Sequence, residues 1–93
     1  MPMIKQYDYV NAYCVSVANR EDLENVVTFA YNYSEARALA KKFFKERDKT
    51  VGYSLLRAQK IISDVPKNLN GKLCASKDDE GYPLLEKNGY AFE

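Results

Sequence analysis

The sequence predicts an α+β fold in which a β-hairpin, one amphipathic helix and a third strand form a β-β-α-β sheet domain. Two stretches rich in Tyr, Val and Phe, residues 7–19 and 26–33, predict the hairpin, and apolar residues at helical spacing follow them. A chain of 93 residues supports one modest core, so residues 1–93 are predicted to be a single domain. Residues 7–65 form the predicted ββαβ core and residues 66–93 a C-terminal segment.

The first strand is predicted within YDYVNAYCVSVAN, residues 7–19, because Tyr and Val dominate it without helical spacing of apolar positions. The polar residues 20–24 then form a connection. The second strand, VVTFAYNY, again combines β-branched and aromatic residues. Two such stretches joined by a polar connection are typical of a hairpin.

The helix is predicted to begin after Asn32 or Ser34, either of which can accept a hydrogen bond from an unpaired amide of the first turn. Glu35, three residues after Asn32, completes a capping box. Five apolar residues then follow the i, i+3, i+4, i+7, i+8 pattern of an amphipathic helix that runs to about Asp48: Ala36, Leu39, Ala40, Phe43 and Phe44.

Residues 53–62, YSLLRAQKII, are predicted to form the third strand, with a helix as the alternative because Leu, Arg, Ala, Gln and Lys favour helices. A hairpin and one helix alone give too small a core, which favours the strand. Near the C-terminus, Asn88-Gly89 lies between Leu84-Leu85 on one side and Tyr90-Ala91-Phe92 on the other. Asn-Gly is a strong two-residue turn signal and predicts a short terminal hairpin.

Side chains alternate between the two faces of a strand, so each predicted strand divides into two sets. Small residues form one set in each of the first two strands: Val10, Ala12, Cys14 and Ser16, then Val26, Thr28 and Ala30. Bulky residues form the other: Tyr7, Tyr9 and Tyr13, then Phe29 and Tyr31. Because the helix carries its own bulky side chains, we expect it to pack on the small sets.

The bulky sets, on this interpretation, form an aromatic face that the helix leaves open. Its residues are the predicted partner-binding set: Tyr7, Tyr9, Tyr13, Phe29, Tyr31, Tyr53 and Arg57. Such a patch is larger than monomers usually expose. Three kinds of cover remain open: the C-terminal segment, a second copy in a dimer, or a protein partner. Tyrosine suits interfaces because it buries a large ring at little entropic cost.

Positive charge is concentrated in one part of the chain. Residues 37–60 hold eight basic and two acidic residues, a balance of +6, although the whole chain carries only +1. The helix residues Arg37, Lys41, Lys42 and Lys45 lie close in sequence and could follow a phosphate backbone. Nucleic-acid binding through this helix is therefore the alternative function to protein binding.

No catalytic, cofactor or metal motif stands out in the sequence. The chain has no histidine, and its four glycines are scattered singly, so neither the common general base nor a phosphate-binding loop is present. Asp78, Asp79 and Glu80 are adjacent and lack a calcium-loop pattern. We predict that the protein is not an enzyme and binds no cofactor and no metal.

Two cysteines without a close-spaced partner indicate reduced thiols rather than a secreted disulfide framework. The sequence also shows no signal peptide and no membrane-spanning run. We therefore expect a cytoplasmic protein that does not associate with membranes.

The junction VTFAYNYSEARALAKKFF, Val27 to Phe44, resembles the strand-to-helix hinge of small proteins encoded by bacteriophages and other mobile elements. This resemblance covers about a fifth of the chain. It implies a compact, non-enzymatic binder of host machinery, including inhibitors of restriction or CRISPR defence, in the host cytoplasm. The resulting hypothesis is a protein-binding module that occludes a surface of a host complex through the aromatic face.

Overall fold

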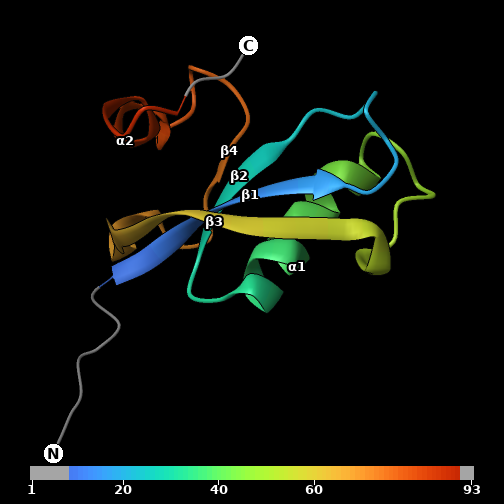
Figure 1. Ribbon diagram of the computed structural model, residues 1–93, viewed down its shortest axis with the longest axis horizontal. Helices are drawn as coiled ribbons and strands as arrows, with labels where there is room; N and C mark the ends of the chain where they lie inside the picture. Colours follow the sequence, from blue (N-terminus) through green and yellow to red (C-terminus); the bar gives the residue numbers. More distant parts are fainter. Residues whose placement is uncertain (1–8, 91–93) are drawn as a thin grey trace, which may run out of the picture.

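The computed structural model describes residues 9–90, which form a four-stranded sheet with helices packed against it (Figure 1). In chain order the elements are β1 (Tyr9–Val17), β2 (Val26–Ala30), α1 (Tyr33–Lys45), the 3-10 helix η1 (Tyr53–Leu55), β3 (Leu56–Pro66), the 3-10 helix η2 (Lys67–Leu69), β4 (Leu73–Cys74) and α2 (Tyr82–Lys87). The strand order is β3-β1-β2-β4, and every neighbouring pair is antiparallel. The predicted α+β class is confirmed.

The helix α1 begins where the capping chemistry predicts. Asn32 adopts an extended conformation, and its Oδ1 accepts a hydrogen bond from the Glu35 amide at 2.9 Å. Asn32 is therefore the N-cap rather than Ser34. The Glu35 carboxylate accepts from the Tyr31 amide at 3.2 Å, one residue earlier than an ideal capping box requires. The helix ends at Lys45, three residues before the predicted end.

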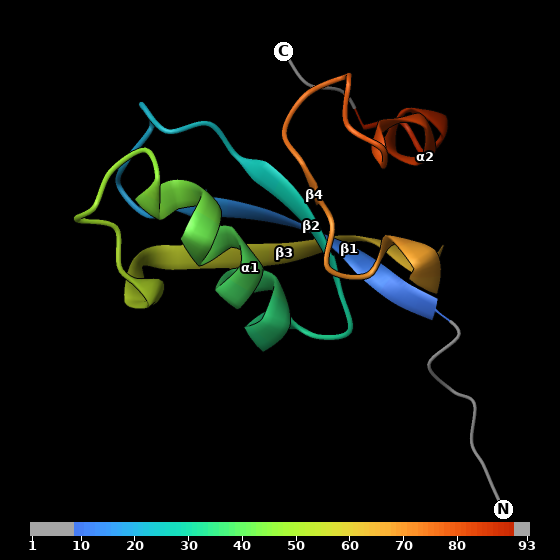
Figure 2. The ribbon, with the colours of Figure 1, turned by 180° about the vertical axis from the view of Figure 1, so that it is seen from behind.

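The helix α1 lies across β1, β2 and β3 on one face of the sheet, which Figure 2 shows from the helix side. Ala36, Ala40 and Phe44 are its buried residues, spaced by four so that they share one side of the helix. They pack with β1 through Tyr13, Val15 and Val17 and with β2 through Val26 and Ala30. The two alanines let the helix approach the sheet closely, and Phe44 fills the space at the far end.

The prediction that α1 packs on the small set of β1 is wrong. The register places the bulky set of β1 and the small set of β2 on the same face of the sheet, and α1 packs on that face. Tyr13 lies opposite Thr28 and Val15 opposite Val26, so the bulky set of β1 shares a face with the small set of β2. Ala12 pairs with Phe29 on the other face. Each face thus combines large and small side chains, which fills space evenly instead of separating an aromatic face from a small one.

The C-terminal segment covers part of the face opposite α1. Leu69, Cys74, Tyr82 and Leu85 form a second buried cluster with Val10, Ala12, Val27, Phe29 and Val65. A methyl group added at Gly81 would lie 2.5 Å from the Phe29 ring, so only glycine lets the start of α2 approach the sheet this closely. Of the three covers considered for the sheet, the C-terminal segment is the one that the fold provides here.

The predicted terminal hairpin at Asn88-Gly89 is wrong, because these residues end α2. Gly89 has φ +87°, its amide donates to the Glu86 carbonyl at 3.0 Å, and the Tyr90 amide donates to the Leu85 carbonyl at 2.9 Å. This pair of bonds is the Schellman motif that closes helices with a left-handed glycine. The same freedom of glycine at positive φ that favours a hairpin turn serves a helix end here.

The third strand is confirmed as a strand and is longer than predicted. Residues 53–55 form η1, and β3 then continues to Pro66, past the predicted end at residue 62. Its pairing with β1 is regular from Leu56 to Lys60 and shifts twice further along, between Tyr13 and Ala12 and between Ala12 and Val10 of β1. Asp64, with φ +61°, lies in this irregular half. Such bulges twist a strand and interrupt its ladder.

Candidate functional site

The seven residues of the predicted partner-binding set do not share one face. Tyr13 is only 2% exposed beneath α1, with its ring centre 4.8 Å from that of Tyr33, and Phe29 is fully buried on the opposite side of the sheet. Tyr31 is half-buried, and Tyr7 lies outside the described residues. The seven residues therefore do not form one exposed aromatic face.

The remaining three members of the set lie at the surface. Tyr9, at the start of β1, is 57% exposed, and Tyr53 in η1 is 37% exposed. Arg57 is exposed near the start of β3. Tyr53 and Arg57 line the same pocket, which also includes Leu56 and Ala58 of the first half of β3.

The strand β3 forms an edge of the sheet, and its hydrogen-bonding pattern shows which groups face outward. The Ala18 amide donates to the Leu55 carbonyl at 2.7 Å, which fixes the alternation of bonded and non-bonded pairs along β1 and β3. Residues 57 and 59 then bond to β1, whereas the backbone groups of Leu56, Ala58 and Lys60 point away from it. No strand among residues 9–90 pairs with this outer side.

The outward groups of Leu56 are already occupied by nearby residues. Its amide donates to the Tyr53 carbonyl, and its carbonyl accepts from Arg57 Nη1 at 3.1 Å. Arg57 Nη1 also donates to the Ser54 carbonyl at 2.8 Å, which holds the arginine against the entry to β3. Ala58 and Lys60 are therefore the residues whose outward amide and carbonyl groups remain available for a further strand.

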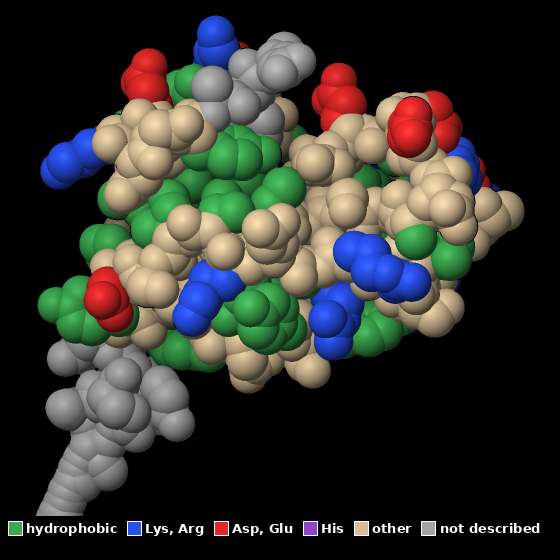
Figure 3. Space-filling model, viewed as in Figure 1, with side chains coloured by type: hydrophobic (Ala, Val, Ile, Leu, Met, Phe, Trp, Pro, Cys, Tyr) green, Lys and Arg blue, Asp and Glu red, His purple; other side chains and the backbone are tan. Residues whose placement is uncertain are grey.

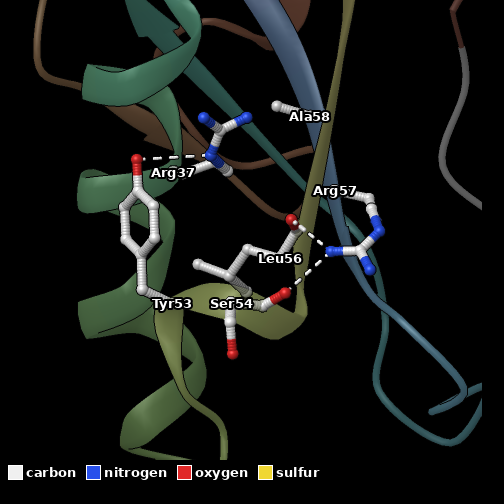
Figure 4. Close-up of a pocket in the computed structure, with 6 residues that line it drawn as sticks. All are labelled: Arg37, Tyr53, Ser54, Leu56, Arg57 and Ala58. Carbon is white, nitrogen blue, oxygen red and sulfur yellow. Dashed lines mark hydrogen bonds between the residues drawn. The ribbon is translucent and has the colours of Figure 1, made fainter.

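A shallow pocket of about 360 Å³ adjoins this stretch of β3 on the side of α1. Figure 4 shows its lining residues: Arg37, Tyr53, Ser54, Leu56, Arg57 and Ala58. Arg37 projects from α1 toward Ala58, while Arg57 points to the other side of the strand (Figure 4). The pocket thus joins the helix, the 3-10 turn and the outer edge of the sheet.

A short hydrogen-bond chain fixes the position of Arg37. Its Nε donates to the Tyr53 hydroxyl at 3.2 Å, and that hydroxyl donates to the Ser34 carbonyl at 3.3 Å. The neighbouring Arg37 guanidinium lowers the pKa of the Tyr53 phenol below its ordinary value. Arg37 is consequently held by its Nε, and the end of its side chain points toward Ala58 (Figure 4).

The electrostatic character of this edge is positive. Arg37, Arg57 and Lys60 take part in none of the ion pairs found among the described residues, which join Arg20 to Asp22 and Asp48, and Lys72 to Glu80. Figure 3, which views the molecule from the side of β3 opposite α1, shows Lys and Arg side chains along the level of this strand. Around residues 56–60 the edge therefore presents three cations that form no ion pair with a carboxylate of the described residues.

The predicted nucleic-acid set on α1 is divided between two directions. Arg37 and Lys41 are half-buried, and Arg37 turns toward η1 and β3. Lys42 and Lys45 are exposed on the outer side of the helix. Arg37 contacts Tyr53, so one member of the basic set meets one member of the predicted partner-binding set.

The two cysteines lie in one row across the sheet. Cys14 of β1 and Cys74 of β4 both pair with Val27 of the strand between them, so two strand spacings, about 10 Å, separate them, too far for a disulfide. The Tyr90 hydroxyl lies 3.7 Å from Cys14 Sγ. Burial, reinforced by Asp79, raises the pKa of the Cys74 thiol to about 11, so this thiol is protonated and inert at neutral pH.

Neither a metal centre nor a membrane span is found in the described part of the chain. Between residues 9 and 90, no three Cys, Asp or Glu side chains gather closely enough to hold an ion. None of the helices in this range has the length and apolar character to cross a membrane.

Sequence patterns alone did not identify the β3 edge, although two signals were present. Lys60 and Pro66 both occur inside the strand. Lysine and proline are residues that natural proteins place on sheet edges. Comparisons of the chain with protein-family models, with curated proteins and with solved structures find no match.

Proposed function

We propose that the protein is a small, non-enzymatic protein-binding module that takes an extended segment of a partner onto the outer edge of β3. The observation that carries this proposal is the outward direction of the backbone groups of Ala58 and Lys60 beside the Arg37–Tyr53 pocket. Strand addition uses such groups for affinity and an adjoining pocket for side-chain selection. The proposal keeps the predicted protein-binding role and moves its surface from the tyrosines to the sheet edge.

The finer hypothesis of a phage-type inhibitor fits within this proposal. The resemblance of Val27–Phe44 to hinges of mobile-element proteins suggests a host defence complex as the source of the partner segment. An inhibitor of this kind would occlude a surface by seating one strand of its target on β3, without performing chemistry on it.

The experiment uses blocked seven-residue peptides of threonine and valine that carry two glutamates, two glutamines or two lysines. The peptides are titrated into ¹⁵N-labelled protein, and the amide shifts of Ala58 and Lys60 are followed by NMR. At least one peptide is expected to shift both amides selectively. If no peptide of any charge shifts them at millimolar concentration, strand addition at β3 is wrong.

Two proline variants provide the matched control. Ala58→Pro removes the outward amide of residue 58 and leaves the ladder to β1 intact, so it should preserve the fold and abolish peptide binding, which is read for this variant from the Lys60 amide. Gln59→Pro removes an amide that bonds to β1, so its melting temperature should fall much further. A folded Ala58→Pro variant that binds peptide as well as the parent protein contradicts the proposal.

Nucleic-acid binding is the second candidate. The observation favouring it is that the basic residues of α1 lack carboxylate partners among the described residues and that Arg37 meets the exposed Tyr53 ring, with its Cζ 5.4 Å from the ring centre. Mobility-shift assays with DNA and RNA probes over a salt series test this, because phosphate contacts give strongly salt-dependent affinity. Absence of a shift at low salt removes this candidate.

A further inference from the structure

We infer that the segment bound at β3 is acidic, with carboxylates at two alternate positions, one opposite Ala58 and one opposite Lys60. This inference rests on the proposed function and specifies the partner. Its physical basis is the direction of side chains in the added strand combined with the two cations on the α1 side of the edge, Arg37 and Lys60.

The register of β3 determines where the side chains of an added strand would lie. Leu56, Ala58 and Lys60 pair with Val17, Val15 and Tyr13, residues that face α1. A partner residue directly opposite Ala58 therefore places its side chain on the same side, into the space next to Arg37. A residue two positions along lies opposite Lys60, again on the side of α1.

Ala58 is the position that admits a long partner side chain. Its methyl group leaves room between Leu56 and Lys60, and the pocket extends from it to Arg37 on the helix. A glutamate placed there would reach the terminal nitrogens of Arg37, whose Nε is held by Tyr53. The glutamate opposite Lys60 would pair with that ammonium across the strands.

The residue between these two glutamates would point to the other side of the sheet, where Arg57 and Gln59 lie opposite Ser16 and Cys14. This side carries the half-buried small residues Cys14 and Ser16. A short β-branched residue suits this position. The preferred segment thus contains two carboxylates separated by one small or β-branched residue.

A second copy of the chain is a poor occupant of the same edge. In a symmetric antiparallel pair of β3 strands, the exposed charges brought together within residues 56–63 are Arg57 and Lys60 of both copies, with no acidic residue to offset them. Like charges across neighbouring strands are destabilising. The bulges beyond Lys60 also prevent a long regular pairing.

Peptide charge and spacing test the inference. The peptide Thr-Thr-Glu-Val-Glu-Thr-Thr is expected to bind about three- to tenfold more tightly than its glutamine analogue, because two exposed ion pairs contribute modestly. The advantage should disappear in high salt, and a peptide with adjacent glutamates should lose about half of it. The Kd is measured from the Ala58 and Lys60 amide shifts.

Charge-removing variants locate the interaction. Arg37→Gln and Lys60→Gln should each remove part of the preference for glutamate over glutamine. Lys42→Gln is the matched control, because it removes one positive charge from the exposed outer side of α1 and should leave the preference unchanged. Melting temperatures of all three variants establish that the fold is retained.

Each failure has a different meaning. Equal binding of the glutamate and glutamine peptides overturns the acidic-segment inference and leaves strand addition standing, whereas no shift with any peptide overturns both. An equal loss with Lys42→Gln shows a general charge effect and contradicts the assigned positions. A ten-residue oligothymidine that shifts the same amides at lower concentration than the glutamate peptide overturns the inference in favour of nucleic acid.

Discussion

The two faces of the sheet are closed in different ways: α1 covers one face, and the C-terminal segment covers part of the other. On one face a single thirteen-residue helix, α1, inserts Ala36, Ala40 and Phe44 between three strands. On the other, η2 and the six-residue α2 cover the sheet in short pieces, while β4, an edge strand of the sheet itself, adds Cys74 to the buried cluster. A continuous helix couples its packing contacts, whereas short pieces can separate from a sheet one at a time. We therefore expect the α1 face to be lost only on global unfolding and the C-terminal face to open locally.

Paired core truncations give the largest expected effects. Phe44→Ala should cost about 3–5 kcal/mol of global unfolding free energy, because it leaves a cavity beneath α1. Leu85→Ala should act mainly on local opening, since Leu85 anchors α2. Urea denaturation measures the first effect. The second is measured by the rate at which Ellman's reagent modifies Cys74 in a Cys14→Ser background.

The expected contrast is that Leu85→Ala accelerates Cys74 modification more than an equally destabilising change beneath α1 does. If the modification rate of Cys74 depends on the global unfolding free energy in the same way in both variants, the sheet and its two covers unfold as one unit.

A smaller effect is expected from Gly81→Ala, which tests how closely α2 approaches the sheet. The added methyl group would overlap the Phe29 ring, so α2 or the ring must move, at about 1–3 kcal/mol. Gly52→Ala is the matched control, because nothing lies within 4 Å of the position its methyl group would take and its φ is negative. Denaturation midpoints should fall for Gly81→Ala and stay level or rise slightly for Gly52→Ala. Equal midpoints would contradict the close contact.

The N-terminus of α1 provides the next test. Asn32→Ala should cost about 1 kcal/mol, because the Glu35 amide loses its acceptor, and Asn32→Asp should retain most of the stability. Ser34→Ala should have little effect, since Ser34 lies inside the helix. Thermal denaturation followed by circular dichroism distinguishes the two sites. A larger loss at Ser34 than at Asn32 would show that the cap is not Asn32.

The smallest expected effect concerns acid stability at the loop that follows α1. The Thr50 hydroxyl and amide, together with Arg20, lower the pKa of Asp48 from 3.8 to about 2. A carboxyl with a lowered folded-state pKa stabilises the fold above its ordinary pKa, and this contribution is lost as pH falls from about 4 to 2. Asp48→Asn should therefore weaken the decline of melting temperature over that range, while Glu46→Gln should not. An unchanged pH profile in Asp48→Asn would rule out this contribution.

Local sequence signals predicted the elements well, because their causes lie within a few residues. The cap at Asn32 needs only Glu35, and the stripe from Ala36 to Phe44 needs only helical spacing. The α+β class and the strand nature of β3 followed from similar patterns. What these signals do not contain is how one strand is aligned with another.

The error in the faces came from register. The alternation within β1 and within β2 was predicted correctly, but residues 18–25 form a connection too long for a tight turn to fix their alignment. A shift of one residue decides whether Tyr13 lies beside Thr28 or beside Phe29. The aromatic binding face depended on the wrong alignment, whereas Tyr53 and Arg57 remained at the surface because their positions did not depend on it.

The ambiguity of Asn88-Gly89 has a similar origin. Both a hairpin turn and a Schellman helix end require a residue at positive φ, and Gly89 satisfies either. The choice depends on whether the preceding residues are helical. Leu85 is buried against the sheet and holds them in α2.

The regular stretch of β3, Leu56 to Lys60, has a consequence for the kinetics of binding. Five residues span about 16 Å and leave only a few backbone groups for a partner, each contributing about 1 kcal/mol. A complex formed there alone would dissociate quickly. A long-lived complex would require a second contact or a high local concentration of the acidic segment. Because the available edge is short, the protein would depend on avidity for stable binding.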